Sequence, residues 1–217
     1  MPLLALAGCQ GGGSGGGNTG APEGNLVGAR IGGDFTLANQ DGQPTRWADF
    51  AGKYRIVYFG YTYCPDVCPF DLTNIMAGFR LLERSDPAKA AKIQPIFITV
   101  DPQRDTPAVL KTYVAAFHPR LIGLTGTPEA IEAVEKAFVV VASKEGDEKA
   151  TQDYLVSHTR TPYLFGPDGK PIALIPINSQ LPGQPAPAQG TQVNGAAADR
   201  EDGSPEAVRD FLERYVQ

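Results

Sequence analysis

Two short apolar strands separated by an amphipathic helix constrain the fold of this chain more than any other feature. The first run, 55–60, reads Arg-Ile-Val-Tyr-Phe-Gly, and the second, 93–100, reads Ile-Gln-Pro-Ile-Phe-Ile-Thr-Val. Between them, large apolar residues recur at helical spacing: Leu72, Ile75, Met76, Phe79 and Leu82. Strand, helix and strand in this order form a βαβ unit with parallel strands and a right-handed crossover. The sequence therefore predicts an α/β fold in which helices cover the faces of a sheet.

Signals on either side of this unit predict two hairpins and three more helices. Asp41-Gly42 between the runs 33–37 and 45–47 favours a β-hairpin, as does Gly166-Pro-Asp-Gly169 between 163–165 and 171–175. Ser or Thr followed by Pro predicts helices near 107–117, 128–138 and 205–216, and strands are expected at 121–125 and 138–142. A βαβ half followed by a hairpin and a last helix is the thioredoxin-like order, here with an added N-terminal β-hairpin.

Glycine and apolar residues indicate where the folded part begins and ends. Nine of the 25 Gly lie in the first 24 residues, and residues 178–204 contain only Leu181 and Val193 as large apolar side chains. We therefore expect a linker at 1–24, one domain at 25–217, and a long irregular, flexible loop at 178–204 before the last helix. A domain of this size folds without cross-links. Three Cys and a net charge of −5 argue against a disulfide framework and against nucleic-acid binding, and we expect a monomer.

The first residues predict a lipid anchor. Leu6-Ala-Gly-Cys9 resembles the lipobox of bacterial lipoproteins, in which the Cys is lipidated and becomes the mature amino terminus. Residues 10–24 would form a coil spanning roughly 20 Å, enough to hold a domain clear of lipid head groups. We therefore expect lipidation of Cys9 and a location at the bacterial cell envelope, on the periplasmic face of the inner membrane. No Lys or Arg precedes Cys9, so we infer a truncated or misassigned start; an accidental Cys is the alternative.

A cysteine pair lies where the first parallel strand meets its helix, at the edge of the sheet where ligands bind. Cys64 and Cys68 are separated by three residues, one more than in thioredoxin, and Pro69 suits the first turn of a helix. We expect Cys68 at the helix N-terminus and Cys64 in the preceding turn, where unpaired N–H groups and the helix dipole favour both thiolates. The pair predicts a redox-active dithiol or two arms of a metal site, with thiolates selecting Cu(I) or Zn.

Two histidines are candidates for a further ligand. His118 lies at the expected carboxyl end of a helix, where a cation complements the dipole, and this role is sufficient to explain it. His158 follows Cys68 by 90 residues and precedes the second hairpin. In a thioredoxin-like topology this connection returns to the cysteine loop, so His158 can face the two sulfurs. Spacing alone leaves a ligand and a plain loop histidine as equally good interpretations of His158.

The segment Asp101-Pro-Gln-Arg-Asp105 follows the second parallel strand and lies on the same edge as the cysteines. Asp101, Arg104 or Asp105 could therefore support the site or contact a partner protein. The alternative is that Asp105-Thr106-Pro107 caps the next helix. The sequence favours neither interpretation, and we expect none of these residues to be a metal ligand.

Four separated motifs resemble the Sco/SenC family of copper-binding, thioredoxin-like proteins. In order between about 31 and 177 they are Tyr58-Phe-Gly-Tyr-Thr-Tyr-Cys-Pro-Asp-Val-Cys-Pro69, Phe97-Ile-Thr-Val-Asp-Pro-Gln-Arg-Asp-Thr-Pro107, Phe117-His-Pro-Arg-Leu-Ile-Gly-Leu-Thr-Gly-Thr-Pro128 and Tyr154-Leu-Val-Ser-His-Thr159. In that family both Cys of the motif and the later His bind copper, which implies Cys64, Cys68 and His158 here. Ser157 departs from the pattern, because an Asp that could orient the imidazole commonly precedes the histidine.

The resemblance implies a copper-delivery protein. Two thiolates and a neutral imidazole suit Cu(I) in a near-trigonal set, whereas Cu(II) needs a tetragonal set with an added oxygen ligand. The implied recipient is the dinuclear copper A site in subunit II of cytochrome c oxidase, with other periplasmic copper chaperones or thioredoxin-like reductases as further partners. Two alternatives use the same residues. One is a thiol–disulfide oxidoreductase in which Cys64 and Cys68 reduce an acceptor's cysteines, and the other is a redox or copper sensor.

Overall fold

The computed structural model describes residues 24–146, 153–177 and 202–217. The expected lipidation at Cys9, the linker up to residue 23 and most of the loop expected at 178–204 lie outside these residues. Within the described part of the chain, no helix combines the length and apolar character needed to cross a membrane.

The described residues form a seven-stranded mixed sheet in the order β2-β1-β5-β4-β3-β8-β9. The strands are β1 (Thr36–Asn39), β2 (Pro44–Arg46), β3 (Tyr54–Gly60), β4 (Ile93–Thr99), β5 (Ile122–Thr125), β8 (Tyr163–Phe165) and β9 (Pro171–Leu174). β3, β4 and β5 are parallel, whereas the outer pairings are antiparallel. Every residue of β3 is buried, as its apolar sequence predicts for the middle of a covered sheet.

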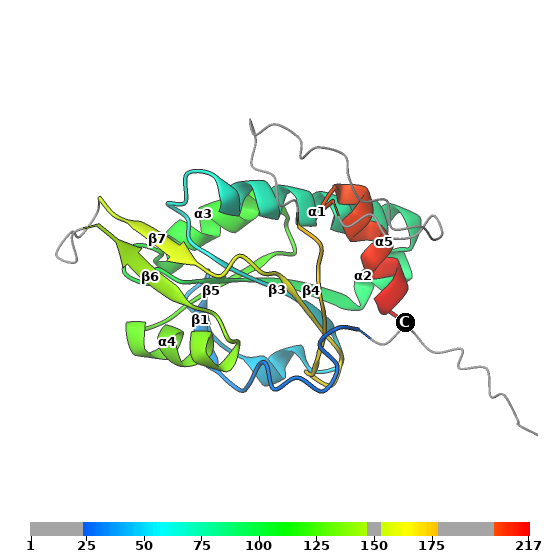
Figure 1. Ribbon diagram of the computed structural model, residues 1–217, viewed down its shortest axis with the longest axis horizontal. Coiled ribbons are helices and arrows are strands. Elements are labelled where there is room, and N and C mark those ends of the chain that lie inside the picture. Colours follow the sequence, from blue (N-terminus) through cyan, green and yellow to red (C-terminus); the bar gives the residue numbers. More distant parts are fainter. Residues whose placement is uncertain (1–23, 147–152, 178–201) are drawn as a thin grey trace, which may run out of the picture.

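Helices cover both faces of this sheet. They are α1 (Val67–Ser85), α2 (Pro87–Ala91), α3 (Pro107–Phe117), α4 (Pro128–Ala137) and α5 (Pro205–Tyr215), with a 3₁₀ turn at Trp47–Phe50. Figure 1 shows α1, α3 and α5 over one face and α4 on the other. The predicted caps are confirmed, because the side chains of Thr106, Thr127 and Ser204 each accept a hydrogen bond from the backbone N–H three residues later. The α/β class, the βαβ unit and both hairpins of the thioredoxin-like prediction are confirmed.

The strand predicted at 138–142 is wrong. Phe138 ends α4 instead, Val139 has a positive φ of 57°, and the chain enters β6 (Ala142–Glu145) only after this turn. β6 pairs with β7 (Leu155–His158) in a separate two-stranded sheet that the sequence analysis missed. The sequence of β6, Ala-Ser-Lys-Glu, carries little strand signal, because three of its four residues are polar and exposed.

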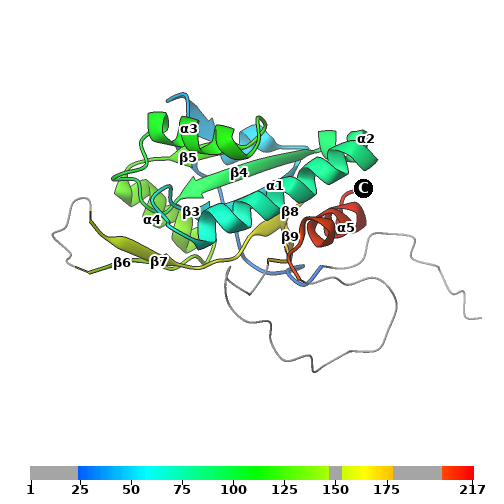
Figure 2. The ribbon, with the colours of Figure 1, turned by 90° about the horizontal axis from the view of Figure 1, so that it is seen from above.

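Gly78 allows α1 and α5 to pack closely. A Cβ atom at Gly78 would lie 2.6 Å from Val208 Cβ and 2.7 Å from the carbonyl oxygen of Pro205, both on the α5 side. Figure 2 shows α5 alongside the carboxyl-terminal part of α1. The absence of a side chain at position 78 therefore allows α5 to pack closely against α1.

Replacing Gly78 with Ala should lower the free energy of unfolding by about 1–3 kcal/mol, because the added methyl group overpacks the α1–α5 contact. Gly33→Ala is the matched control, since a Cβ there would lie at an ordinary 3.6 Å from Ala137 Cβ. Equilibrium denaturant unfolding of the two variants makes the comparison. Equal stabilities of Gly78→Ala and Gly33→Ala would show that α5 does not require the close approach.

Glu135 on α4 should make stability depend on pH. Burial, with a smaller contribution from Glu132, raises the pKa of Glu135 from 4.5 to about 7. A carboxyl group with a raised pKa favours the folded state only while it is protonated, so its cost to stability grows as the pH rises from 4.5 to 7. Glu135→Gln should therefore leave stability at pH 4 unchanged and raise it by about 1 kcal/mol at pH 8, after allowance for solvent screening. A gain of the same size at both pH values would contradict this.

Candidate metal centre

The two cysteines lie on opposite sides of the start of α1. Cys68 is the second residue of the helix and is fully buried, whereas Cys64 lies in the preceding turn and is partly exposed. Both are free thiols in the structure. Gly60, the last residue of β3, makes room for this arrangement, because a Cβ there would lie 3.2 Å from Cys68 Sγ. The predicted positions at the helix N-terminus and in the turn before it are therefore confirmed.

The pKa values of the two thiols are shifted in opposite directions. Hydrogen bonding from the Cys68 thiol, with donation from the backbone of Asp66 and Cys68, lowers the pKa of Cys64 to about 5. The backbone N–H of Cys68 lies 3.4 Å from Cys64 Sγ. The same hydrogen bond and burial raise the pKa of Cys68 far above its usual range. The expectation of two thiolates is therefore wrong in the metal-free state, because a second negative charge would be buried beside the first.

His158, the last residue of β7, faces Cys68. Its Nε2 atom lies 3.2 Å from Cys68 Sγ, and its Nδ1 atom lies 3.0 Å from the carbonyl oxygen of Thr159. A carbonyl oxygen can only accept, so Nδ1 carries a proton, and Nε2 is the ring nitrogen that faces the sulfur. The structure thus brings His158 to the cysteine pair, with a backbone carbonyl orienting the ring. Ser157 is exposed, on the other side of the strand.

His118 does not join this group. It is the C-cap residue of α3, as predicted, but it is buried, and burial lowers its pKa. Its Nδ1 accepts a hydrogen bond from the backbone N–H of Arg120 at 3.1 Å, and its Nε2 lies 3.1 Å from Glu83 Oε2. The predicted role as a cation on the helix dipole is therefore wrong, because the imidazole is neutral and donates to Glu83. Glu83 and Cys68 are separated by most of α1, about 22 Å along its axis.

The donor set suits a soft metal ion. Two sulfurs and one imidazole nitrogen are the ligands that Cu(I) and Zn prefer, and hard cations such as Mg²⁺ select oxygen instead. Among the described residues, no three His, Cys, Asp or Glu side chains already stand at the mutual spacing of a metal-ligand set. Closing Cys64, Cys68 and His158 around one ion therefore requires local side-chain movement and loss of the Cys68 proton.

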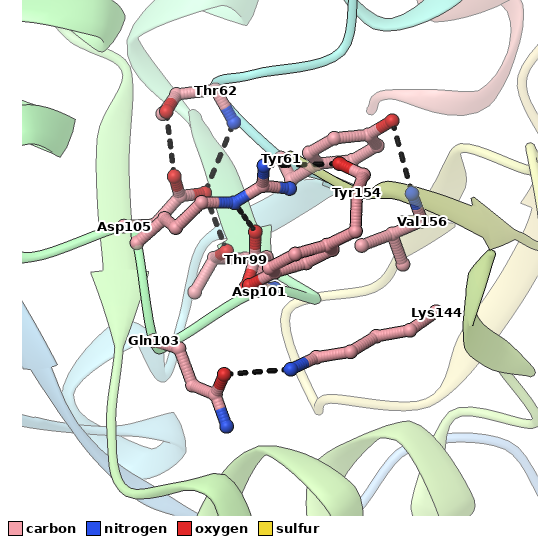
Figure 3. Close-up of polar contacts among 10 residues, drawn as sticks. Tyr61, Thr62, Thr99, Asp101, Gln103, Asp105, Lys144, Tyr154 and Val156 are labelled. Atoms are coloured by element: carbon pink, nitrogen blue, oxygen red, sulfur yellow. Dashed lines mark hydrogen bonds and ion pairs between the residues drawn. The ribbon is translucent and has the colours of Figure 1, made fainter. Parts of the chain in front are cut away.

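Asp105 supports the cysteine loop and does not cap α3. The cap is Thr106, whose hydroxyl accepts from Val109 N–H. Asp105 is fully buried and accepts hydrogen bonds from Thr62 N–H at 3.0 Å and from Thr62 Oγ1 at 2.6 Å, as Figure 3 shows. Both interpretations that the sequence left open therefore hold, because Thr106 of the Asp105-Thr106-Pro107 motif caps α3 and Asp105 supports the cysteine loop.

A buried ion pair between α1 and the segment that follows His158 was not predicted from the sequence. Asp71 lies one turn after Cys68 and is buried, and it accepts hydrogen bonds from Tyr58 Oη at 2.9 Å and from Arg160 Nε at 2.6 Å. Arg160 follows His158 by two residues, so the pair ties the exit of β7 to the helix that carries Cys68. An Asp within a helix carries no sequence signal of such a distant partner.

Comparison with known proteins identifies the family. The SCO1/SenC family model matches residues 24–186. Protein SCO2, mitochondrial, of Saccharomyces cerevisiae is 44% identical over 140 residues, which cover 64% of this chain and 46% of the relative. Protein SCO2 homolog, mitochondrial, of Bos taurus is 45% identical over 137 residues, covering 63% and 50%. The chain thus spans about half the length of these curated relatives.

Solved structures share both sequence and fold with this chain. Bradyrhizobium japonicum ScoI with copper bound is 33% identical, with a TM-score of 0.67, over 86% of this chain and 99% of that one. Arabidopsis thaliana ScoI with copper bound is 39% identical, with a TM-score of 0.61, over 66% and 86%. BsSco, described as having a disulfide switch and as a member of the Sco family of cytochrome c oxidase assembly proteins, is 26% identical, with a TM-score of 0.52, over 66% and 81%.

One expectation is overturned by these matches, and two are confirmed. The curated relatives are named as mitochondrial proteins of eukaryotes, which contradicts the predicted lipid-anchored location at the bacterial cell envelope. The thioredoxin-like fold and the resemblance noted from the motifs are both confirmed. By its sequence, its fold and the match over 24–186, this chain belongs to the SCO1/SenC family.

Proposed function

We propose that this protein binds copper through Cys64, Cys68 and His158 and delivers it to the dinuclear copper A site of cytochrome c oxidase. The observation that carries the proposal is the 3.2 Å approach of His158 Nε2 to Cys68 Sγ, next to a Cys64 sulfur whose pKa is lowered to about 5. Relatives solved with copper bound support the choice of metal. A relative described as a cytochrome c oxidase assembly protein supports the choice of process.

Each ligand has a distinct part in capture and release. Cys64 is partly exposed and ionised near neutral pH, so it meets the incoming ion first. Cys68 gives up its proton as it binds, and neutral His158 completes a three-ligand set from the strand side. Such a set leaves one side open to an acceptor's thiolates, which can replace the ligands one at a time. The soft sulfur ligands favour Cu(I) over harder ions.

Transfer to an acceptor tests the proposal. Cu(I)-loaded protein is mixed with a metal-free soluble domain of subunit II, the product is oxidised by one electron with ferricyanide, and formation of the mixed-valence copper A centre is followed by its visible absorption. We expect the centre to form with the unchanged protein and not with Cys64→Ser or Cys68→Ser at the same copper concentration. Equal formation of the copper A centre with the serine variants or with free copper would contradict the delivery role.

A thiol–disulfide oxidoreductase is the second candidate, and the opposite pKa shifts of the two thiols favour it. The partly exposed Cys64 thiolate would attack an acceptor's disulfide to form a mixed disulfide, and Cys68, deprotonated in turn, would resolve it and leave the acceptor as a dithiol. This route uses the cysteines and does not require His158 as a ligand. A His158→Ala variant that keeps its reductase rate but delivers no copper would separate the two activities.

A further inference from the structure

The loop between β4 and α3 contacts both segments that carry the candidate ligands. Asp105 holds the cysteine loop through Thr62, two residues before Cys64. Asp101 is buried and accepts a hydrogen bond from Tyr154 Oη at 2.7 Å, four residues before His158. One carboxylate of loop 101–105 therefore contacts the cysteine side, and the other contacts the histidine side (Figure 3).

The two carboxylates are fixed relative to each other. Thr99 Oγ1 donates to Asp105 Oδ2 at 2.6 Å and accepts from the backbone N–H of Asp101 at 2.9 Å. The backbone N–H of Asp105 also donates to the carbonyl oxygen of Asp101 at 3.0 Å. Because these bonds are buried, loop 101–105 is a rigid spacer between the cysteine loop and β7.

Arg104 fills the space between the same segments. Its Nε donates to Asp101 Oδ2, and its Nη1 donates to the carbonyl oxygen of Tyr154 at 3.0 Å. The guanidinium carbon lies 3.7 Å from the ring centroid of Tyr154 and 4.7 Å from that of Tyr63, in the cysteine loop. Arg104 thus neutralises Asp101 and packs against aromatic rings from both sides.

The alternation of side chains along β7 links these contacts to the position of His158. Side chains two residues apart point to the same side of a strand, so Tyr154, Val156 and His158 share one side. Tyr154 and Val156 are buried, and the alternating residues Leu155 and Ser157 are exposed. The backbone N–H of Val156 donates to Tyr61 Oη at 3.2 Å, a direct contact between β7 and the cysteine loop. Anchors at 154 and 156 therefore set where the ring at 158 lies.

We propose that Asp101, Arg104 and Tyr154 are positioning residues that hold β7 against the cysteine loop and so keep His158 within reach of the sulfurs before copper arrives. The inference rests on the proposed copper function. We call Asp101, Arg104 and Tyr154 the bracket. A site that is ordered in advance loses less conformational entropy on binding, so the bracket raises copper affinity although none of its three residues is a ligand. It also offers a support for the histidine strand in a chain where Ser157 supplies no carboxylate.

Tyr154→Phe tests the bracket, because it removes the hydroxyl that donates to Asp101 and leaves the ring under Arg104. We expect copper affinity to fall about 10-fold and the nitrogen hyperfine coupling of the Cu(II) form to weaken, while the rate at which Cys64 reacts with a thiol reagent stays unchanged. Tyr215→Phe on α5 is the matched control. Wild-type affinity together with a wild-type spectrum in Tyr154→Phe would overturn the proposal.

A metal-free measurement separates failure of the bracket from failure of the copper function. Amide hydrogen exchange at Val156 should be about 10-fold faster in Tyr154→Phe than in Tyr215→Phe, because β7 opens locally more often. Tyr61→Phe, which removes the acceptor of that N–H, should act in the same direction. If copper affinity does not depend on His158, the proposed function fails, and the exchange rates alone decide the bracket. Exchange in both test variants equal to the control would refute the bracket even where copper binds.

Discussion

The His158→Ala variant is expected to bind Cu(I) at least about 100-fold more weakly than the unchanged protein. Removing a group that merely supports a ligand typically lowers metal affinity by about 10–100-fold, so loss of the ligand itself should lower it at least as much. The imidazole is already oriented by the Thr159 carbonyl, with Nε2 3.2 Å from Cys68 Sγ, so the substitution removes a nitrogen that already stands beside the cysteine pair. Anaerobic competition with a Cu(I) chelator of known affinity measures the change.

The other histidine supplies the matched control. His118→Gln keeps a donor for Glu83 and an acceptor for the backbone N–H of Arg120, the two hydrogen-bond partners of the His118 ring. We expect this variant to lose some stability and to keep its copper affinity. An equal loss of affinity in both variants, or no loss in His158→Ala, would remove His158 from the site.

The Arg160→Met variant is expected to lose about 3–5 kcal/mol of its free energy of unfolding. Asp71 is 1% exposed, so removing its cation leaves a buried carboxylate whose remaining side-chain donor, among the described residues, is the Tyr58 hydroxyl. The cost reflects the stranded charge more than the net contribution of the pair. Denaturant unfolding of the metal-free protein measures this loss without involving copper.

A paired variant makes this second prediction specific. Asp71→Asn combined with Arg160→Met removes both charges, so it should be clearly more stable than Arg160→Met alone. If the two variants were equally unstable, the loss would come from packing of the Arg160 side chain and not from the buried charge. A loss below about 1 kcal/mol in Arg160→Met would place this pair among ordinary exposed ion pairs.

Local sequence signals predicted most of the fold because they act over short distances. Pro after Ser or Thr placed the starts of α3, α4 and α5, and a mainly apolar run placed β3. The hairpin β6–β7 escaped because its strands are short and half exposed, so alternation and apolar content are both weak. Its pairing depends on tertiary contacts, among them the hydrogen bond from Val156 to Tyr61.

The candidate ligands could be predicted from the sequence, whereas the residues that hold them in place could not. The spacing of Cys64 and Cys68 after a strand indicates a redox or metal site. The role of His158 came from the family resemblance, since spacing alone left it open. The partners Asp71 and Arg160 are 89 residues apart, and nothing local in either segment points to the other. The neutral state of His118 likewise depends on burial, which lowers its pKa, and on the backbone N–H of Arg120 that donates to Nδ1, and both arise only in the folded structure.

X-ray absorption at the copper edge of the Cu(I)-loaded protein tests the central claim most directly, because it counts the atoms bound to the metal. The account predicts two sulfur ligands and one nitrogen ligand per copper, with the nitrogen lost in His158→Ala and one sulfur lost in Cys64→Ser or Cys68→Ser. A copper bound by sulfur alone in the unchanged protein, or a nitrogen ligand that survives His158→Ala, would contradict it.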